Sequence, residues 1–212
     1  MSSSEGPRSV KIGADERTGW SSERPRRDGA PPRPADISTR CKVLRPAEAL
    51  RYSPGSLLLI VSPSETDREA LAERVVEQTG AVLTTGKVRS LLAGRVPDEE
   101  MDARAAQLLD AAVAKRLDAN ESTVVVTRGL DPAERERFAR LASKAKRPRH
   151  IILVEAAREQ VAEEDRTPLN ELRTRLDAGG LGAEGFDTAL RLGGASISEL
   201  KRIVFRPAPR DD

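Results

Sequence analysis

The alternation of short apolar runs with helix-like segments constrains the fold of this chain more than any other feature. Five runs have the character of buried strands, and they cover residues 57–61, 81–83, 122–126, 150–154 and 188–192. Segments with helical spacing lie between and after them, around 65–78, 101–117, 132–141, 156–164, 168–176 and 197–202. Strands separated by helices pair in parallel and are covered on both faces. We therefore predict an α/β fold over residues 54–212, with a doubly wound, parallel five-stranded sheet and helices on both of its faces.

Residues 1–53 differ in composition from the rest of the chain. Up to about residue 40 they are rich in Ser, Pro, Gly, Arg and Asp, and residues 1–54 hold 11 Lys or Arg against 7 Asp or Glu. Apolar residues have no regular spacing there, so no face could bury enough area to offset the entropy of ordering. We predict a disordered basic tail followed by a lead-in at 41–53. The tail is either an arm that contacts nucleic-acid phosphates or a solubilising segment, and Trp20 is either a docking residue or exposed by chance.

Composition excludes several classes of protein. The single Cys41 rules out an intramolecular disulfide framework and a multi-cysteine zinc site. His150 has no second His or Cys to share a metal, so we expect a structural role for it. No run approaches the roughly 18 apolar residues that cross a bilayer, and the N-terminus lacks the apolar core of a signal peptide. We predict a cytoplasmic protein without a membrane partner and without a metal site.

The stretch after the first predicted strand has the setting of a phosphate-binding loop. Working P-loops read G-x-x-x-x-G-K-S/T, because glycines let backbone N–H groups close around phosphates while the lysine and the hydroxyl contact phosphate and Mg²⁺. Here Ser62 replaces the first glycine and Asp67 the second. Arg68 replaces the lysine and Glu69 the hydroxyl residue. Carboxylates then point where phosphate oxygens would lie, and like charges about 4 Å apart repel by roughly 4 kcal/mol at an effective dielectric of about 20.

The same loop also has the pattern of a helix start, which gives its acids a structural explanation. Ser62 suits the N-cap, Pro63 the first helical position, and Glu65 completes a capping box. Carboxylates are favourable at a helix N-terminus. The candidate nucleotide contacts of this altered P-loop are its hydroxyl and cationic side chains, Ser62, Ser64, Thr66 and Arg68.

Three stretches carry a resemblance to a known family. They are RLDANESTVVV at residues 116–126, PAER at 132–135 and EGFD at 184–187. Together with the order of strands and helices, they make residues 57–206 similar to the P-loop kinase module of bacterial polynucleotide kinase-phosphatase enzymes, among the AAA-like and zeta-toxin-like P-loop kinases. The resemblance implies a P-loop kinase-like fold. In active members it implies ATP-dependent phosphorylation of a polynucleotide 5′-hydroxyl.

Position by position, the resemblance implies that the catalytic groups are missing. The aspartate that activates the acceptor hydroxyl in the family falls on Gly86, which cannot accept a proton. The family's Asp-Ala-Thr-Asn segment is replaced by TRGL at 127–130. Phosphoryl transfer depends almost wholly on positioning and charge stabilisation. Loss of the phosphate cradle, the metal ligand and the catalytic base together would therefore leave little catalytic activity. We predict a degenerate, non-catalytic pseudokinase that has no catalytic residue, requires no cofactor and acts as a binding or regulatory module for an unknown protein partner.

Two alternatives stay open. The first is a protein that binds nucleic-acid ends through Arg89, which matches the family's acceptor-phosphate arginine, together with Lys87, Arg128 and the basic tail. The second is an active ATP-dependent kinase that uses Arg68 as a phosphate contact and Asp67 or Glu69 as a Mg²⁺ ligand. In that case the lid arginines of the family correspond to Arg166, with Arg158 and Arg173 nearby.

Overall fold

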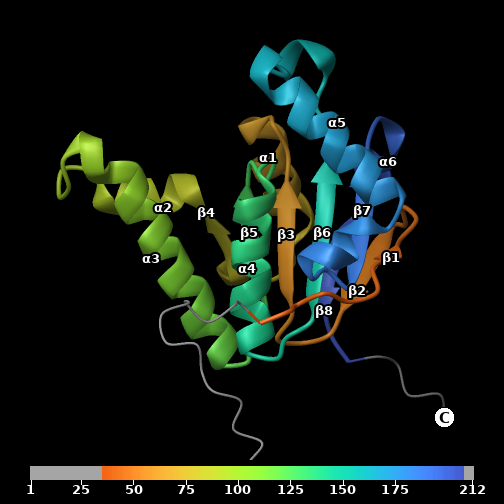
Figure 1. Ribbon diagram of the computed structural model, residues 1–212, viewed down its shortest axis with the longest axis horizontal. Helices are drawn as coiled ribbons and strands as arrows, with labels where there is room; N and C mark the ends of the chain where they lie inside the picture. Colours follow the sequence, from red (N-terminus) through yellow and green to blue (C-terminus); the bar gives the residue numbers. More distant parts are fainter. Residues whose placement is uncertain (1–34, 208–212) are drawn as a thin grey trace, which may run out of the picture. The chain divides into compact units, whose positions relative to one another are not determined.

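A parallel sheet of six strands forms the centre of the computed structural model, which describes residues 35–207. Its strands are β1 (Lys42–Val43), β3 (Leu57–Val61), β4 (Val82–Thr84), β5 (Thr123–Thr127), β6 (Arg149–Val154) and β7 (Thr188–Leu192). They are paired in the order β1-β7-β6-β3-β5-β4 (Figure 1). A second parallel sheet pairs β2 (Ala49–Tyr52) with β8 (Arg202–Phe205). The predicted disorder of the tail and the role of Trp20 concern residues outside the described range.

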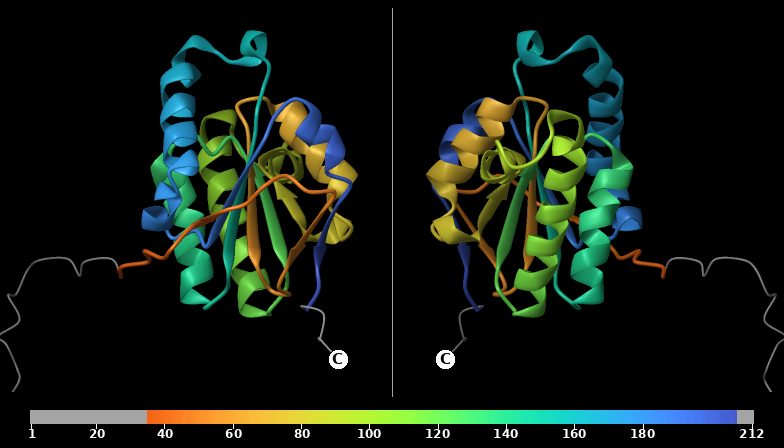
Figure 2. Two further views of the ribbon diagram at one scale, coloured as in Figure 1. Left: turned by 90° about the vertical axis from the view of Figure 1, so that its right-hand side faces the viewer. Right: turned by 90° about the vertical axis from the view of Figure 1, so that its left-hand side faces the viewer.

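Helices cover both faces of the six-stranded sheet. The α-helices are α1 (Glu65–Val75), α2 (Thr85–Leu92), α3 (Asp98–Asp118), α4 (Pro132–Lys144), α5 (Glu163–Asp177) and α6 (Ala195–Glu199), and the 3₁₀ helices are η1 (Thr79–Ala81), η2 (Arg158–Gln160) and η3 (Gly180–Glu184). Helices α3, α4 and α5 lie on one face, whereas α1 and the small sheet lie on the other (Figure 2). The predicted doubly wound α/β fold is therefore confirmed. No helix within residues 35–207 combines the length and the apolar character of a membrane span.

Burial on both faces explains why the central strands read as continuous apolar runs. All five residues of β3 are buried, and so are all five of β5. Because side chains alternate along a strand, Leu57, Leu59 and Val61 pack in the core with α3, α4 and α5. Leu58 and Ile60 pack on the opposite face, against α1 and the small sheet.

Three strands have no counterpart in the sequence-based prediction. β1 makes the main sheet six-stranded instead of five-stranded, and β2 and β8 form the second sheet. β1 and β2 lie in the segment interpreted as a lead-in. The predicted helix at 197–202 is wrong in its second half, because α6 ends at Glu199 and β8 begins at Arg202. Ala49 of β2 pairs with Arg202 of β8. Each of these strands is short and completed by a distant segment, so none has a strong local signal of its own.

The connection after β6 also differs from its prediction as two helices. Residues 158–160 form only the 3₁₀ turn η2, and α5 then runs without a break from Glu163 to Asp177. Pro168 lies inside α5 instead of starting a helix. Proline lacks the N–H that would bond to the carbonyl four residues earlier, which makes its position in the second helical turn costly but not prohibitive.

Candidate functional site

The crevice at the carboxyl ends of β3 and β6 is where this sheet topology places a ligand. These strands are neighbours, but the chain leaves β3 toward β4 at one edge of the sheet and leaves β6 toward β7 on the other side. Ligands in open α/β sheets bind at such a switch point, between loops that separate in opposite directions. The loop at 62–64 and the connection at 155–162 therefore flank the expected ligand position.

The loop between β3 and α1 is short, and its hydroxyl groups bond to backbone amides of the loop and of the first helical turn. Only residues 62–64 separate the strand from the helix. The Ser64 amide donates to Ser62 Oγ at 3.2 Å, and the Asp67 amide donates to Ser64 Oγ at 3.3 Å. The N-cap is thus Ser64, two residues after the predicted Ser62, and α1 starts at Glu65. Both serines complete the helix start, and Thr66 is exposed on its first turn.

Arg68, which takes the place of the P-loop lysine, is directed at the loop itself. Its guanidinium Nη1 donates to the Ser62 carbonyl at 3.1 Å, and its residue is only 9 % exposed. Burial lowers the pKa of Arg68, an effect that the carboxylates of Glu65 and Glu69 partly oppose. The Glu65 carboxylate lies 3.8 Å from the guanidinium. Arg68, which the predicted alignment places at the lysine of a P-loop, therefore has carboxylate and carbonyl partners within the protein.

Carboxylates from α1 face residue 86, the position that the resemblance aligns with the family's catalytic aspartate. A Cβ atom added to Gly86 would lie 3.5 Å from Glu69 Oε1 and 3.8 Å from Glu65 Oε1. The sequence places these acids on a different loop from residue 86, so their proximity is a finding of the structure. An acceptor hydroxyl brought to this edge would meet Glu65 and Glu69, not a side chain at 86.

The loop after β5 is held by Glu134, on the first turn of α4. The Thr127 hydroxyl donates to one oxygen of its carboxylate, and the Gly129 amide donates to the other at 3.1 Å. Gly129 has a φ of +61°, and a Cβ there would lie 2.2 Å from Val61 Cγ1. Residues 127–130 thus pack tightly on the end of β3, with Thr127 and the Gly129 amide bonded to Glu134.

The predicted substrate-binding cations do not converge on one site. Arg89 Nη2 lies 2.8 Å from Asp102 of α3, and Arg128 forms an ion pair with Asp165 of α5, whose side chain is 9 % exposed. Lys87 is exposed on α2, where its backbone amide donates to the N-cap hydroxyl of Thr84 at 3.0 Å. Both arginines therefore have carboxylate partners within the protein, which is the structural alternative to phosphate contact.

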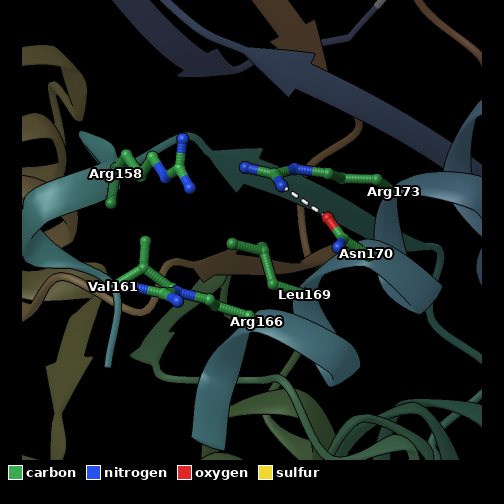
Figure 3. A pocket seen from close by; sticks show the side chains of 7 residues that line it. Arg158, Val161, Arg166, Leu169, Asn170 and Arg173 are labelled. Carbon is green, nitrogen blue, oxygen red and sulfur yellow. Dashed lines mark hydrogen bonds between the residues drawn. The ribbon is translucent and has the colours of Figure 1, made fainter. Parts of the chain in front are cut away.

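A cavity of about 370 Å³ next to the switch point gathers three arginines (Figure 3). We call it the arginine cavity; its lining residues are Ala156, Arg158, Val161, Arg166, Leu169, Asn170 and Arg173. The predicted lid residue Arg166 and its neighbours Arg158 and Arg173 are thus brought together. Sequence reasoning does not identify Asn170 or the apolar lining, because it does not predict the continuous α5 that places them on one side.

Glu155, directly after β6, fixes one of these arginines. Its carboxylate accepts from Arg173 Nε at 3.0 Å and from Arg191 Nε at 2.6 Å. Burial alone would raise the pKa of Glu155, but the hydrogen bonds from both guanidinium groups lower it overall. The hydrogen bond to Glu155 raises the pKa of Arg173. The pair therefore stays charged, and Arg173 is held at the edge of the cavity.

The described residues form no group of three or more His, Cys, Asp or Glu side chains arranged to hold a metal ion.

Comparison with known proteins adds little to this geometry. No protein-family model matches the sequence, and no curated protein matches it. A crystal structure of a "putative kinase" from Chloroflexus aurantiacus aligns with 16% sequence identity and a TM-score of 0.43, and the alignment covers 66% of this chain and 86% of that chain.

Proposed function

We propose that this protein is a non-catalytic, P-loop kinase-like binding module. The observation that carries the proposal is the loop between β3 and α1, where the Arg68 guanidinium is bonded to the Ser62 carbonyl. A phosphate cradle needs free backbone N–H groups and an unengaged cation. In this loop the amides of Ser64 and Asp67 are already bonded to serine hydroxyls.

The charge of the site supports the same proposal. Glu65, Asp67 and Glu69 all lie in the first turn and a half of α1, where a nucleotide would place its phosphates. Each carboxylate opposes the approach of a polyphosphate, and Arg68 alone does not balance them. At the acceptor position, residue 86 has no side chain to act as a base.

Each of the two alternatives makes a distinct demand on the site. An active ATP-dependent kinase would need Asp67 or Glu69 to bind Mg²⁺, and Glu65 or Glu69, which lie beside Gly86, to act as the base. Binding of nucleic-acid ends would need Arg89 and Arg128 to exchange their partners, Asp102 and Asp165, for phosphates. Binding of nucleic-acid ends is less favourable because Arg89 and Arg128 pair with acids on different helices and do not converge on one site.

The expected result with nucleotide is no Mg²⁺-dependent stabilisation. We would measure the melting temperature of the full chain with ATP up to several millimolar, with and without Mg²⁺. A ligand that binds only the folded state adds about 2.7 kcal/mol of stability at 100 times its dissociation constant, so binding in this range would be visible. We expect no shift because three carboxylates lie at the start of α1 and Arg68 Nη1 already donates to the Ser62 carbonyl.

A Mg²⁺-dependent rise that disappears in Arg68→Ala or Glu69→Gln, but persists in Glu73→Gln, would contradict the proposal. Glu73 serves as the matched control because it is exposed on the same helix, one turn farther from the loop. In that case phosphorylation of an oligonucleotide with a 5′-hydroxyl would be assayed next.

A further inference from the structure

The arginine cavity is built from one connection of the chain and is separate from the loop after β3. All seven lining residues lie between positions 156 and 173, in the segment that joins β6 to α5 and in α5 itself. No residue of the 62–64 loop lines it. The changes that remove a phosphate cradle from that loop therefore leave this cavity intact.

The ionisable groups that line the cavity are all cations. Arg166, Asn170 and Arg173 are spaced by four and three positions on α5, which places them on one side of the helix. Arg158 faces them from η2, and the guanidinium groups of Arg158 and Arg173 point toward each other in Figure 3. Positive groups that converge without a carboxylate in the lining create a potential that attracts an anion.

Arg173 is held in place before any ligand arrives. Its Nε donates to both oxygens of Glu155, at 3.0 and 3.1 Å, and its Nη1 donates to Asn170 Oδ1 at 2.8 Å. Glu155 is held in turn by Arg191, which also bonds to Asp177 at 2.9 Å. With Nη2 also bonded to Glu155, two of its five N–H groups have no partner in the described part of the chain. A guanidinium fixed in this way binds an oxyanion without further loss of side-chain freedom.

Arg158 supplies a cation that is not neutralised. It is exposed on η2, and within residues 35–207 it forms no ion pair. Arg166 is about half exposed and pairs with Glu163 one turn earlier on α5. Beside the three guanidinium groups lie the side chains of Val161 and Leu169, both buried. The cavity thus combines a cationic side with an apolar one.

We propose that the arginine cavity binds the phosphate monoester group of a small molecule whose body is apolar. A phosphate monoester carries close to two negative charges and three acceptor oxygens, which suits several guanidinium groups better than the two oxygens of a carboxylate. The volume of about 370 Å³ is at the lower end of small-molecule sites, so it accepts a single compact ligand. The proposal goes beyond the proposed binding module and does not depend on whether the loop after β3 binds nucleotide.

Calorimetric titration of the full chain tests the proposal with phenyl phosphate as the probe. Inorganic phosphate tests the contribution of the apolar side, benzoate tests the choice of oxyanion, and ATP without Mg²⁺ tests a nucleotide as the source of the phosphate. We expect saturable binding of phenyl phosphate, weaker binding of the other three, and affinity that decreases with salt.

The matched variants are Arg158→Gln, Arg166→Gln and, as the control, Arg95→Gln. Arg95 is exposed between α2 and α3 and lies outside the cavity, so its replacement makes the same change in charge. Loss of a charge-assisted hydrogen bond should weaken phenyl phosphate binding about tenfold in Arg158→Gln and in Arg166→Gln. Arg95→Gln should bind as the unmodified protein does.

Three results would overturn the proposal: no saturable binding of phenyl phosphate, the same loss of affinity in the Arg95 control, or benzoate binding as tightly as phenyl phosphate. ATP that binds more tightly than phenyl phosphate and loses affinity in Arg158→Gln would also overturn it, because the ligand would then be a nucleotide. Mg²⁺-dependent ATP binding that needs Arg68 but not Arg158 would instead contradict only the proposed function.

Discussion

Replacing Glu184 with glutamine should lower the free energy of unfolding by about 3–5 kcal/mol, the largest effect that we expect from a single substitution in this chain. Glu184 ends η3 with a fully buried side chain, and Arg135 of α4 is only 1 % exposed. The two side chains form a bidentate pair, in which Arg135 Nε and Nη2 each donate to a carboxylate oxygen at 2.7 Å. Glutamine keeps the shape but leaves the Arg135 charge buried without its counter-ion.

The position of the pair explains why its removal should destabilise more than one contact. Arg135 Nη1 also donates to the carbonyls of Gly129 and Leu130, at 2.8 and 2.9 Å. Arg175 of α5 approaches Glu184 at 2.9 Å from the more exposed side. One ion pair therefore joins the loop after β5 to α4, η3 and α5, and its loss loosens four segments together.

Urea unfolding followed by circular dichroism measures this change. Glu171→Gln is the matched control, because Glu171 is exposed on α5, and it should change stability by less than about 0.5 kcal/mol. The double variant Arg135→Met, Glu184→Leu should recover much of the loss, since it removes both buried charges. A loss below about 1 kcal/mol in Glu184→Gln would show that water or Arg175 compensates Arg135, contrary to the role assigned to the pair.

The sequence was sufficient to predict the central layer of the fold because its signal is local. β3 and β5 are buried on both sides, so β3 is entirely apolar and β5 has three successive valines, and the helices between them show regular spacing. β2 and β8 could not be recognised in the same way. Only alternate residues of β2 are buried, and its partner lies near the other end of the chain.

In the candidate site, too, the features that depend on local sequence could be predicted and those that depend on packing could not. Residue types at the end of β3 predict a P-loop without its phosphate-binding groups, and this stays a prediction. The structure adds the internal bonds of Ser62, Ser64 and Arg68, on which the proposed function rests. Which carboxylate each arginine meets could not be predicted. Arg89 and Arg128 are paired with acids on α3 and α5, and only the packing of those helices decides these partners.

His150 should make the protein less stable as the pH falls below neutrality. The ring lies on β6, stacked on Tyr52 at 4.3 Å between centroids, and Nδ1 is 2.9 Å from Thr188 Oγ1. Nε2 is buried without a hydrogen-bond partner in the described part of the chain. Burial lowers the pKa of His150 from 6.5 to about 4, although Asp187 opposes part of that shift. The imidazole is therefore neutral in the folded protein at neutral pH, in agreement with the structural role expected from the sequence.

The direction of the effect is set by proton binding in the two states. Between pH 6.5 and about 4 the unfolded chain binds a proton at His150 and the folded protein does not. Protonation then favours unfolding. The contribution of the neutral His150 to the free energy of unfolding is therefore fully present above about pH 6.5 and is lost as the pH falls toward 4. At 1.36 kcal/mol per pH unit, the loss between about pH 7 and pH 5 is about 2 kcal/mol. Glu155, whose pKa is lowered in the folded state, adds a further loss only as the pH falls below its ordinary value of 4.5.

His150 is the only histidine of the chain, which makes the measurement direct. Its ring-proton resonance should titrate with a midpoint near pH 4 in the folded protein, and the unfolding free energy should fall by about 2 kcal/mol between pH 7 and pH 5. His150→Phe keeps an aromatic ring against Tyr52 but cannot be protonated, so its stability should be nearly constant over that interval. A ring-proton midpoint above pH 6, or an equal loss of stability in His150→Phe, would contradict this prediction. Water or another polar group would then reach Nε2, and the contact between β2 and β6 would be accessible to solvent.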